Sequence, residues 1–229
     1  MTHQGKSWDD EYKNKKLVTN KSEPQADTLR FFKFLKKDQK YKIEYRNILD
    51  LGCGTGRNAN YLAEKDNSVI GIEISKTAIG IAKTRAKELG VSVDYRMGDI
   101  GVPYEIEDDS IDIVIDVTSS NSLNEKGREI YLKEVHRVLK KGGFVFVRAL
   151  AKDGNKNVKN LLKNSPGREY DTYFLKDLGI TERVFSKDDF IKMYEKYFKI
   201  LKFEKKTSYS TMSGVVYKRD YFLAYMQKK

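Results

Sequence analysis

The sequence is poor in cysteine, proline and long apolar runs, and each shortage excludes a class of protein. The single cysteine, Cys53, has no partner for an internal disulfide. Three prolines and the lack of a Gly/Ser/Pro-rich stretch give no sign of an interdomain linker. No apolar run is longer than a strand, so none could cross a bilayer, and the first twenty residues lack the apolar core of a signal peptide. We therefore expect a cytoplasmic protein with no membrane partner.

Basic residues outnumber acidic ones, with 44 Lys and Arg against 33 Asp and Glu and a formal net charge of +11. One interpretation is an acidic partner, most naturally RNA or DNA, attracted through its phosphates. The other is a lysine-rich, solvated surface, because the lysines are scattered along the chain and acidic residues interrupt several of their groups. No arginine-rich tract or nucleic-acid module accompanies the charge, so both interpretations stay open.

An arm and a helix precede the main pattern of the chain. Residues 1–21 are polar and lysine-rich, and we expect them to be irregular or weakly helical. Ser22 can cap a helix that runs to about Lys37. The helical spacing of three apolar side chains predicts that they are buried. They are Leu29, Phe32 and Leu35.

From Asn47 onward, short apolar segments alternate with helical ones, which is typical of a parallel sheet. Right-handed crossovers then place helices on both faces of that sheet. The expected strands span residues 48–51, 68–74, 91–95, 111–117 and 144–150. The expected helices span residues 57–65, 76–89 and 125–139. Ser75 caps the second helix, whose apolar stripe consists of Ala78, Ala82, Ala86 and Leu89.

The C-terminal third departs from this alternation. Residues 151–185 have weak periodicity, and we expect an insertion with one short helix. Ser186–Asp189 resembles a capping box and predicts a helix to about Tyr197. Residues 198–203 and 217–225 are expected to pair at the edge of a mixed sheet. We thus expect a single domain over 1–229, divided into an arm and helix (1–45), a ligand-binding core (46–150), an insertion (151–185) and a C-terminal helix with edge strands (186–229).

The strongest chemical signal is the glycine loop from Asp50 to Gly56, Asp-Leu-Gly-Cys-Gly-Thr-Gly. Alternate glycines let a ligand approach the backbone where the first strand turns into its helix, and the helix start presents N–H groups there. Phosphate-binding and dinucleotide-binding loops look similar, so the loop alone is a weak signal. Glu73 sharpens it, because this residue closes the second strand about twenty residues later, where a carboxylate can accept hydrogen bonds from both ribose hydroxyls of an adenosine.

The loop closely resembles the first motif of the class I S-adenosylmethionine (SAM)-dependent methyltransferases. Later motifs of that family are resembled, in order, by Gly71–Ser75, Gly98–Ile100, Asp109–Val114 and Glu134–Gly143. The resemblance covers about residues 45–150. It implies an α/β, Rossmann-like three-layer sandwich with a mostly parallel seven-stranded sheet of order 3-2-1-4-5-7-6 and an antiparallel strand 7. It also implies SAM as cofactor, S-adenosyl-L-homocysteine (SAH) as product, and a transferase of class EC 2.1.1.-.

The resemblance further implies roles for single residues. The loop glycines would border the methionine part of SAM, and Asp50 would support the loop or bind the amino group. Glu73 would bind the ribose, while Ile74 would pack on the adenine. Asp99 would accept from the adenine amino group, and Ile100 would donate its backbone N–H. No metal is expected. The full set of expected cofactor-binding residues is Trp8, Tyr12, Asp50, Gly52, Cys53, Gly54, Gly56, Asn58, Glu73, Ile74, Ser75, Asp99, Ile100 and Asp116.

The N-terminal arm carries a second, shorter likeness. The segment Trp8–Tyr12 resembles the aromatic entry segment of tellurite-resistance and thiopurine methyltransferases. In those enzymes such aromatics close over SAM. The alternative is a surface aromatic that anchors the arm to the rest of the chain.

The acceptor side is less informative. Asp116 to Asn121 follows the fourth strand, where enzymes that methylate amino groups of nucleobases or protein glutamine often carry an Asp/Asn-Pro-Pro-aromatic motif. Its absence makes that chemistry less favoured. SAM is already an activated donor, so a general base is needed only when the acceptor is protonated at working pH. The catalytic candidates are Asp116, Asn121 and Tyr173, and Arg148 and Tyr170 are further acceptor-side positions.

Four functions are compatible with these observations. We expect methyl transfer from SAM to a small-molecule acceptor. An RNA methyltransferase is the alternative that the basic charge favours. A third is a SAM-fold protein that binds a ligand or a partner without catalysis. The fourth, an NAD-dependent oxidoreductase, is disfavoured by the G-x-G-x-G spacing and by the four downstream motifs.

Overall fold

The computed structural model describes residues 3–14, 21–212 and 215–229. Its strands are β1 (Asn47–Leu51), β2 (Ser68–Glu73), β3 (Asp94–Met97), β4 (Ile111–Val117), β5 (Leu139–Leu150), β6 (Thr172–Leu175), β7 (Ile180–Arg183), β8 (Phe198–Met212) and β9 (Val215–Lys228). Its helices are α1 (His3–Asn14), α2 (Ala26–Lys37), α3 (Arg57–Ala63), α4 (Lys76–Leu89), α5 (Glu125–Val138), α6 (Lys156–Asn164), α7 (Lys187–Tyr194) and the short 3-10 helix η1 (Ser120–Ser122).

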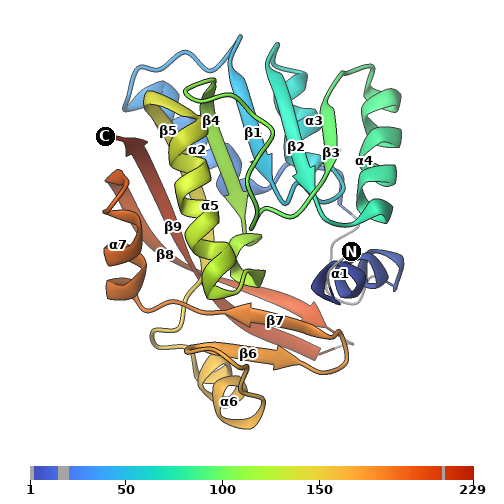
Figure 1. The fold of residues 1–229 in the computed structure, drawn as a ribbon, viewed down its shortest axis with the longest axis vertical. Coiled ribbons are helices and arrows are strands. Elements are labelled where there is room, and N and C mark those ends of the chain that lie inside the picture. The colour runs from blue at the N-terminus through green and yellow to red at the C-terminus, as the bar shows by residue number, and fades with distance from the viewer. Residues whose placement is uncertain (1–2, 15–20, 213–214) are drawn as a thin grey trace.

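The strand order of the large sheet confirms the expected topology. In the described residues this sheet has the order β3-β2-β1-β4-β5-β9-β8 (Figure 1). The pairs from β3 to β5 are parallel, while β9 runs antiparallel to both β5 and β8. β6 and β7 form a separate antiparallel hairpin, which is why the last two strands of the large sheet are numbered 9 and 8. The order 3-2-1-4-5-7-6 with an antiparallel strand 7 is therefore confirmed.

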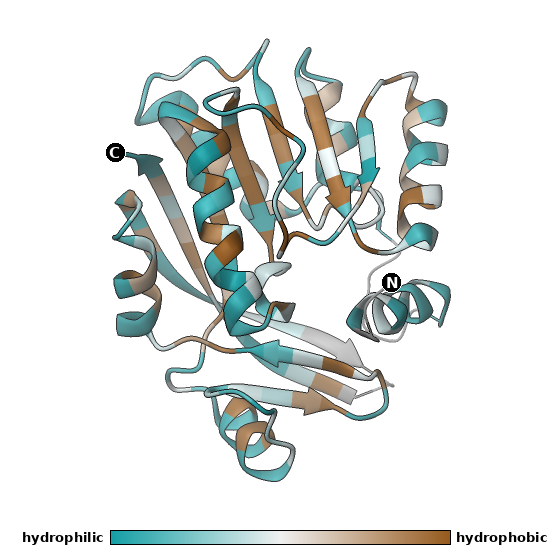
Figure 2. Cartoon of the chain, in the orientation of Figure 1, coloured by the Kyte–Doolittle hydropathy of each residue, from teal (hydrophilic) through white to brown (hydrophobic). Residues whose placement is uncertain are grey.

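The large sheet is buried on both faces. Ile48 and Ile113 belong to the apolar cluster that includes residues of α2, α3 and α4, whereas Leu49 and Val114 belong to the cluster that includes residues of α5 and α7. Successive side chains of a strand point to opposite faces, so each strand feeds both clusters. Figure 2 shows the apolar strands between helices whose outer faces are polar. The result is the expected three-layer α/β sandwich.

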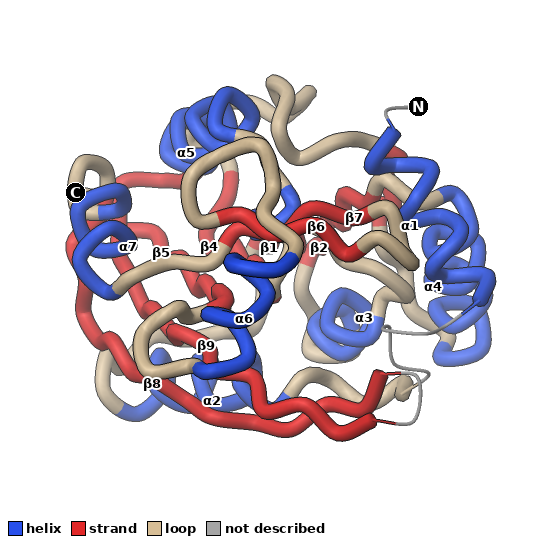
Figure 3. Tube along the Cα trace, turned by 90° about the horizontal axis from the view of Figure 1, so that it is seen from below, coloured by secondary structure: helices blue, strands red, loops and turns tan. Residues whose placement is uncertain are grey.

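One edge of the sheet is covered by the N-terminal helix and by the insertion. The carboxyl ends of β1, β2 and β4 point to the same edge, because these strands are parallel. Figure 3, seen from below, shows α1, α6, β6 and β7 across this edge. Contacts join α1 to α4 and β7, and join β7 to η1. In such sheets ligands bind outside the carboxyl ends of the strands, so these elements enclose the region where a ligand is expected.

The N-terminal prediction needs two corrections. α1 is a regular helix where an irregular or weakly helical arm was expected. α2 begins at Ala26, and its cap is Gln25 rather than Ser22, because the extended Gln25 places its side-chain oxygen to accept from the free N–H groups of the first turn. With that start, Leu29 is exposed and Phe31 is buried instead, stacked on Phe146 with the ring centroids 5.2 Å apart.

Two boundaries in the core also differ from expectation. The third strand begins at Asp94, not at Val91. Leu89 is exposed, because Gly90 takes a left-handed conformation with φ +68° and ends α4 directly after it. The helix caps at Ser75 and Ser186 are confirmed, since their hydroxyls accept from backbone N–H groups three residues later, each at 3.1 Å.

The C-terminal third contains more structure than its pattern predicts. The insertion has the expected short helix, α6, and also the β6–β7 hairpin, which was not predicted. β8 and β9 are longer than expected and pair with each other along almost their whole length. No helix among residues 3–14, 21–212 and 215–229 is long and apolar enough to cross a bilayer.

Candidate active site

The glycine loop has a backbone that only glycine adopts without strain. Gly52, Gly54 and Gly56 have φ values of +67°, +54° and +77°, in the left-handed region that costs other residues energy. Gly52 N donates to the Ile72 carbonyl at 2.8 Å, which holds the loop against the end of β2. Gly56 directly precedes α3. The loop therefore brings the end of β2 and the start of α3 to one place.

Glu73 ends β2 and faces this loop. Its side chain is buried, and its two carboxylate oxygens accept from Gly54 N at 3.0 Å and from Ser75 N at 2.9 Å. Burial raises its pKa, and the backbone N–H donors oppose that rise. No Lys or Arg of the described chain pairs with it within 4.0 Å. A buried carboxylate without a cation at this position can accept hydrogen bonds from two hydroxyl donors.

Asp50 lies on the other side of the loop, near the end of β1. Its side chain is 1% exposed, and it accepts a hydrogen bond from the backbone N–H of Ala59. Its Oδ2 atom has no hydrogen-bond partner among the described residues. Burial first, and then the charge of Asp116, raise the pKa of Asp50 to about 7. An orphaned buried carboxylate oxygen fits a ligand that brings its own N–H donor, such as an ammonium group.

Helix α1 brings the N-terminal aromatics to the same loop. A Cβ atom added to Gly54 would lie 2.6 Å from the Tyr12 hydroxyl, so Tyr12 covers the centre of the loop. The Trp8 ring lies beside it, with the centroids 6.5 Å apart. Asp9 anchors the helix, because its Oδ1 atom accepts from the Ser75 hydroxyl and from Thr77 N, each at 2.8 Å. Asp9 was missed in the sequence, where an acid beside Trp8 gives no sign of capping a helix so distant in the chain.

Two predicted cofactor residues mainly have partners within the protein. Cys53 is buried, and burial raises its thiol pKa. Asn58 accepts at Oδ1 from the backbone N–H of Gln25 at 2.8 Å and so ties α3 to the start of α2. Both lie in or beside the glycine loop, and their contacts with a ligand stay predictions.

The turn after β3 is held next to Glu73, as the predicted adenine site requires. Gly98 N donates to the Glu73 carbonyl at 3.0 Å. Asp99 then accepts from Gly101 N at 2.8 Å, and the Ile100 side chain is buried. Ile74 follows Glu73 directly and is half-buried. The structure thus brings these residues together at one end of the glycine loop, while their roles toward adenine stay predictions.

Asp116, the last residue but one of β4, is a fully buried carboxylate that is hydrogen-bonded within the protein. It accepts from Ser119 N and from the Tyr131 hydroxyl, both at 2.8 Å. Burial raises its pKa, and these donors oppose that rise. A Cβ atom on Gly52 would lie 2.1 Å from the Ser119 hydroxyl oxygen. Asp116 therefore fixes the turn between β4 and η1, which packs against the glycine loop. A direct role of Asp116 in catalysis stays a prediction.

The other two catalytic candidates lie on different elements. Asn121 in η1 is buried and donates through Nδ2 to the Arg183 carbonyl at 2.7 Å. Tyr173 in β6 donates its hydroxyl to Glu182 at 2.6 Å, and Arg219 lies 3.3 Å from the same carboxylate oxygen. The structure therefore places Asn121 beside the turn after β4, and places Tyr173 within the hairpin rather than at the glycine loop.

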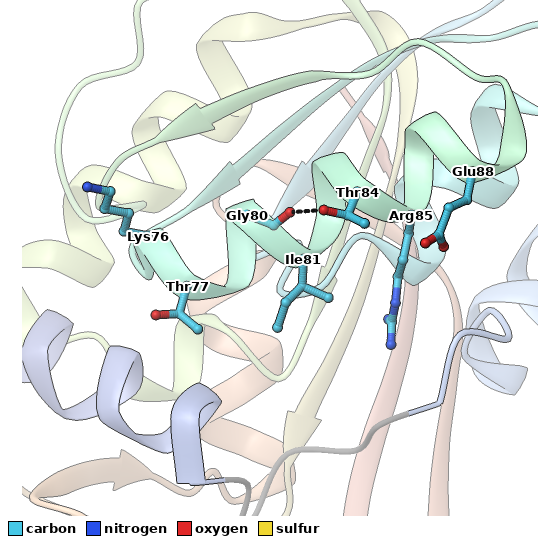
Figure 4. Close-up of a pocket in the computed structure, with 7 residues that line it drawn as sticks. All are labelled: Lys76, Thr77, Gly80, Ile81, Thr84, Arg85 and Glu88. Carbon is cyan, nitrogen blue, oxygen red and sulfur yellow. Dashed lines mark hydrogen bonds between the residues drawn. The ribbon is translucent and has the colours of Figure 1, made fainter.

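The further acceptor-side positions lie on different elements. Arg148, near the carboxyl end of β5, pairs with Asp27 at 3.2 Å, and its guanidinium lies 3.4 Å from the Tyr221 ring centroid. Tyr170 lies in the insertion with an exposed side chain. A separate, open surface hollow lies along α4 and contains none of the predicted site residues (Figure 4). Its lining residues are Lys76, Thr77, Gly80, Ile81, Thr84, Arg85 and Glu88.

Comparison with known sequences agrees with this geometry. Residues 48–143 match the family model of a methyltransferase domain. The ubiquinone biosynthesis O-methyltransferase of Pelagibacter ubique is 30% identical over 124 residues, which are 54% of this chain and 48% of that protein. The chain spans about half the length of the curated relatives it matches.

Comparison with solved structures extends the likeness beyond the matched domain. A SAM-dependent methyltransferase from Methanosarcina mazei has a TM-score of 0.73 and 25% sequence identity, over 83% of this chain and 96% of that one. The 1,6-didemethyltoxoflavin-N1-methyltransferase of Burkholderia thailandensis, whose crystal structure holds 1,6-didemethyltoxoflavin and SAH, shares the fold with a TM-score of 0.71 and 15% identity, over 99% and 88% of the two chains. Residues 48–143 thus match a methyltransferase domain, and the fold over most of the chain is similar to that of SAM-dependent methyltransferases.

Proposed function

We propose that this protein transfers the methyl group of SAM to a small-molecule acceptor. The observation that carries the proposal is the buried Glu73 carboxylate, which has no cation partner among the described residues and accepts a hydrogen bond from the amide of Gly54. A nucleoside ribose offers the paired hydroxyl donors that such a carboxylate accepts. A dinucleotide would use the same carboxylate, but the matched domain over residues 48–143 favours SAM.

The residues of the loop fit both ends of SAM. Glu73 would hold the ribose, and the unpartnered Oδ2 atom of Asp50 would accept from the ammonium of the methionine part. Side chains at Gly52 and Gly54 would clash with Ser119 and Tyr12, so glycine at both positions keeps the loop backbone free of side chains of its own. When bound, SAM supplies a methyl group that its sulfonium already activates. The protein then has to orient the acceptor and exclude water, which is the task we assign to α1 and the β6–β7 hairpin.

Two observations favour a small acceptor. The relatives and structural neighbours include enzymes named for ubiquinone biosynthesis and for a toxoflavin precursor. The covering of the carboxyl edge by α1 and by the β6–β7 hairpin (Figure 3) suits a molecule that can be enclosed better than a folded nucleic acid.

Methyl transfer can be tested with radiolabelled SAM and a size-fractionated cell extract. We expect label in the small-molecule fraction. Label confined to RNA or protein would contradict the small acceptor. No label in any fraction, from a protein that binds SAH, would contradict catalysis. The Glu73→Ala variant should transfer much less label at limiting SAM, while Gly80→Ala, altered on the far side of α4, should match the wild type.

A further inference from the structure

Two arginines near the turn after β4 lack ion-pair partners. Arg128, in the first turns of α5, is only 5% exposed, and Arg183 ends β7. Neither lies within 4.0 Å of a carboxylate in the part of the chain that the structure describes. Both guanidinium groups lie over the Phe185 ring, at 5.5 Å and 5.6 Å from its centroid. Two positively charged guanidinium groups therefore pack on the same aromatic ring.

Several buried polar atoms in this corner have no hydrogen-bond partner. They include the Nε atoms of both arginines and Oδ1 of Asn121. The remaining donors are only partly used: Arg128 donates through Nη2 to the Leu123 carbonyl, and Asn121 donates to the carbonyl of Arg183. Buried polar groups are normally satisfied, so a cluster of unsatisfied ones indicates a group that binds there.

The acidic residues of the neighbourhood make other direct contacts, although the charges of Glu169 and Glu125 still act on Arg128. Glu169 accepts from the backbone N–H of Glu125 at 2.9 Å, and Asp171 pairs with Lys152 at 2.8 Å. Burial, followed by the charge of Arg183, lowers the pKa of Arg128 to about 10. Removing guanidinium groups from water is costly unless an anion compensates them. Among the described residues, no carboxylate makes direct ion-pair contact with either arginine of this corner.

The position of the corner links it to the acceptor. Asn121 belongs to η1, directly after the strand that ends at the glycine loop, and Arg183 belongs to the hairpin that covers this edge. Figure 1 shows the base of α5 next to β7. The exposed Tyr170 ring lies 5.5 Å from the Arg183 guanidinium. A ligand can therefore meet cations, an amide oxygen and an aromatic face together.

We propose that Arg128 and Arg183 bind an oxyanion, a carboxylate or a phosphate, that the methyl acceptor carries. The planar guanidinium fork matches either group through two parallel hydrogen bonds. Asn121 Oδ1 accepts from a hydroxyl or amino group of the same molecule, and the Tyr170 ring packs against that molecule. This inference rests on the proposed function, because it names the class of acceptor for the same site.

The test titrates the full chain with two probes, benzoate for the carboxylate and phenyl phosphate for the phosphate, by calorimetry with and without SAH. We expect the wild type to bind at least one probe. Arg183→Gln and Arg128→Gln should each weaken that probe about tenfold, as expected for loss of one charge-assisted pair. Lys159→Gln removes one positive charge from an exposed position of α6 and should change probe affinity less than about twofold. All three variants should bind SAH like the wild type.

Two results would overturn the inference. One is a wild type that binds neither probe, and the other is an Arg183→Gln variant with unchanged probe affinity. Arg128 is buried, so its variant is compared only if thermal unfolding shows a folded protein, and Arg183→Gln decides alone otherwise. A wild type that does not bind SAH would contradict the proposed function. The probe titrations without SAH would still test the oxyanion site.

Discussion

The glycine loop and the insertion over residues 151–185 meet at one edge of the sheet but are built differently. The loop is formed mainly by its backbone, because three glycines in left-handed conformations hold the amide of Gly54 close to Glu73. Beside the insertion, the contacts that we propose for the acceptor come from side chains of distant segments, as with Asn121, Arg128 and Arg183. A backbone-built site accepts few substitutions, whereas a side-chain-built site can change specificity without altering the fold.

The two regions also differ in charge. The loop side holds the buried carboxylates Asp50, Glu73 and Asp116, and burial raises the pKa of all three. The insertion side holds the unpaired cations Arg128 and Arg183. Carboxylates suit hydroxyl and ammonium donors, while guanidinium groups suit an oxyanion. This contrast supports our proposal of the cofactor on one side and the acceptor on the other.

The largest effect is expected for Gly56→Ala, which tests whether the backbone builds the loop. The added Cβ would lie 2.2 Å from the Tyr95 hydroxyl and 2.9 Å from the Ala82 Cβ, at φ +77°. Strain and overpacking should lower the free energy of unfolding by about 3 kcal/mol. Urea denaturation measures this. A loss below about 1 kcal/mol would show that the loop tolerates a side chain.

A smaller effect is expected for Asp50→Asn, which removes a charge from the loop side. The folded pKa of about 7 lies above the unfolded value near 4, so the native state holds a proton that the unfolded state has lost. This contribution to stability is full below about pH 4 and disappears as the pH rises through about 7. The variant lacks that loss and should be about 2 kcal/mol more stable than the wild type at about pH 6, relative to about pH 4.

Urea denaturation at both pH values checks the difference. SAH binding should weaken in the same Asp50→Asn variant, because the amide oxygen carries no charge for the ammonium. A variant that gains stability and also binds SAH normally would remove Asp50 from the cofactor side.

Tyr12→Ala should weaken SAH binding by about 1 kcal/mol, about fivefold, because it uncovers Gly54. Trp8 is the only tryptophan of the chain and lies beside Tyr12, so its fluorescence reports SAH binding directly. The control is Tyr209→Ala, a side chain that is 71% exposed in β8. Equal affinities for the two variants would leave α1 as an anchor rather than a cover.

The smallest effect is a gain. Gly80 lies inside α4, facing the open hollow of Figure 4, and a Cβ added there meets nothing within 4 Å. Gly80→Ala should therefore stabilise the protein by about 0.5–1 kcal/mol, the difference in helix propensity. Thermal unfolding detects it. A loss of stability would mean that the space beside α4 is occupied in solution.

The sequence predicts the loop side better than the insertion side for a physical reason. Glycines at positive φ and a carboxylate at a strand end are local requirements, so Gly52, Gly54 and Glu73 are visible in the sequence at fixed spacing. The expected sheet order followed from the same motifs. Their individual contacts with SAM stay predictions, because only a bound ligand tests them.

The insertion side depends on contacts between segments that are distant in the chain. The β6–β7 hairpin has strands of four residues each, too short for an alternation to stand out. Its one local signal was the turn Lys176–Gly179, where Gly179 has φ +65°, as three-to-five-residue hairpin loops often require. Arg128 and Arg183 are 55 positions apart in numbering, and nothing local indicates that they share the Phe185 ring.

Calorimetric titration of SAH into the wild type and the Glu73→Ala variant, with NAD as the competing ligand class, tests the central claim most directly. We predict micromolar binding of SAH, no binding of NAD, and a loss of about 1–3 kcal/mol in the variant, since the ribose hydroxyls lose their buried acceptor. Unchanged SAH affinity in the Glu73→Ala variant, or binding of NAD in place of SAH, would contradict the account.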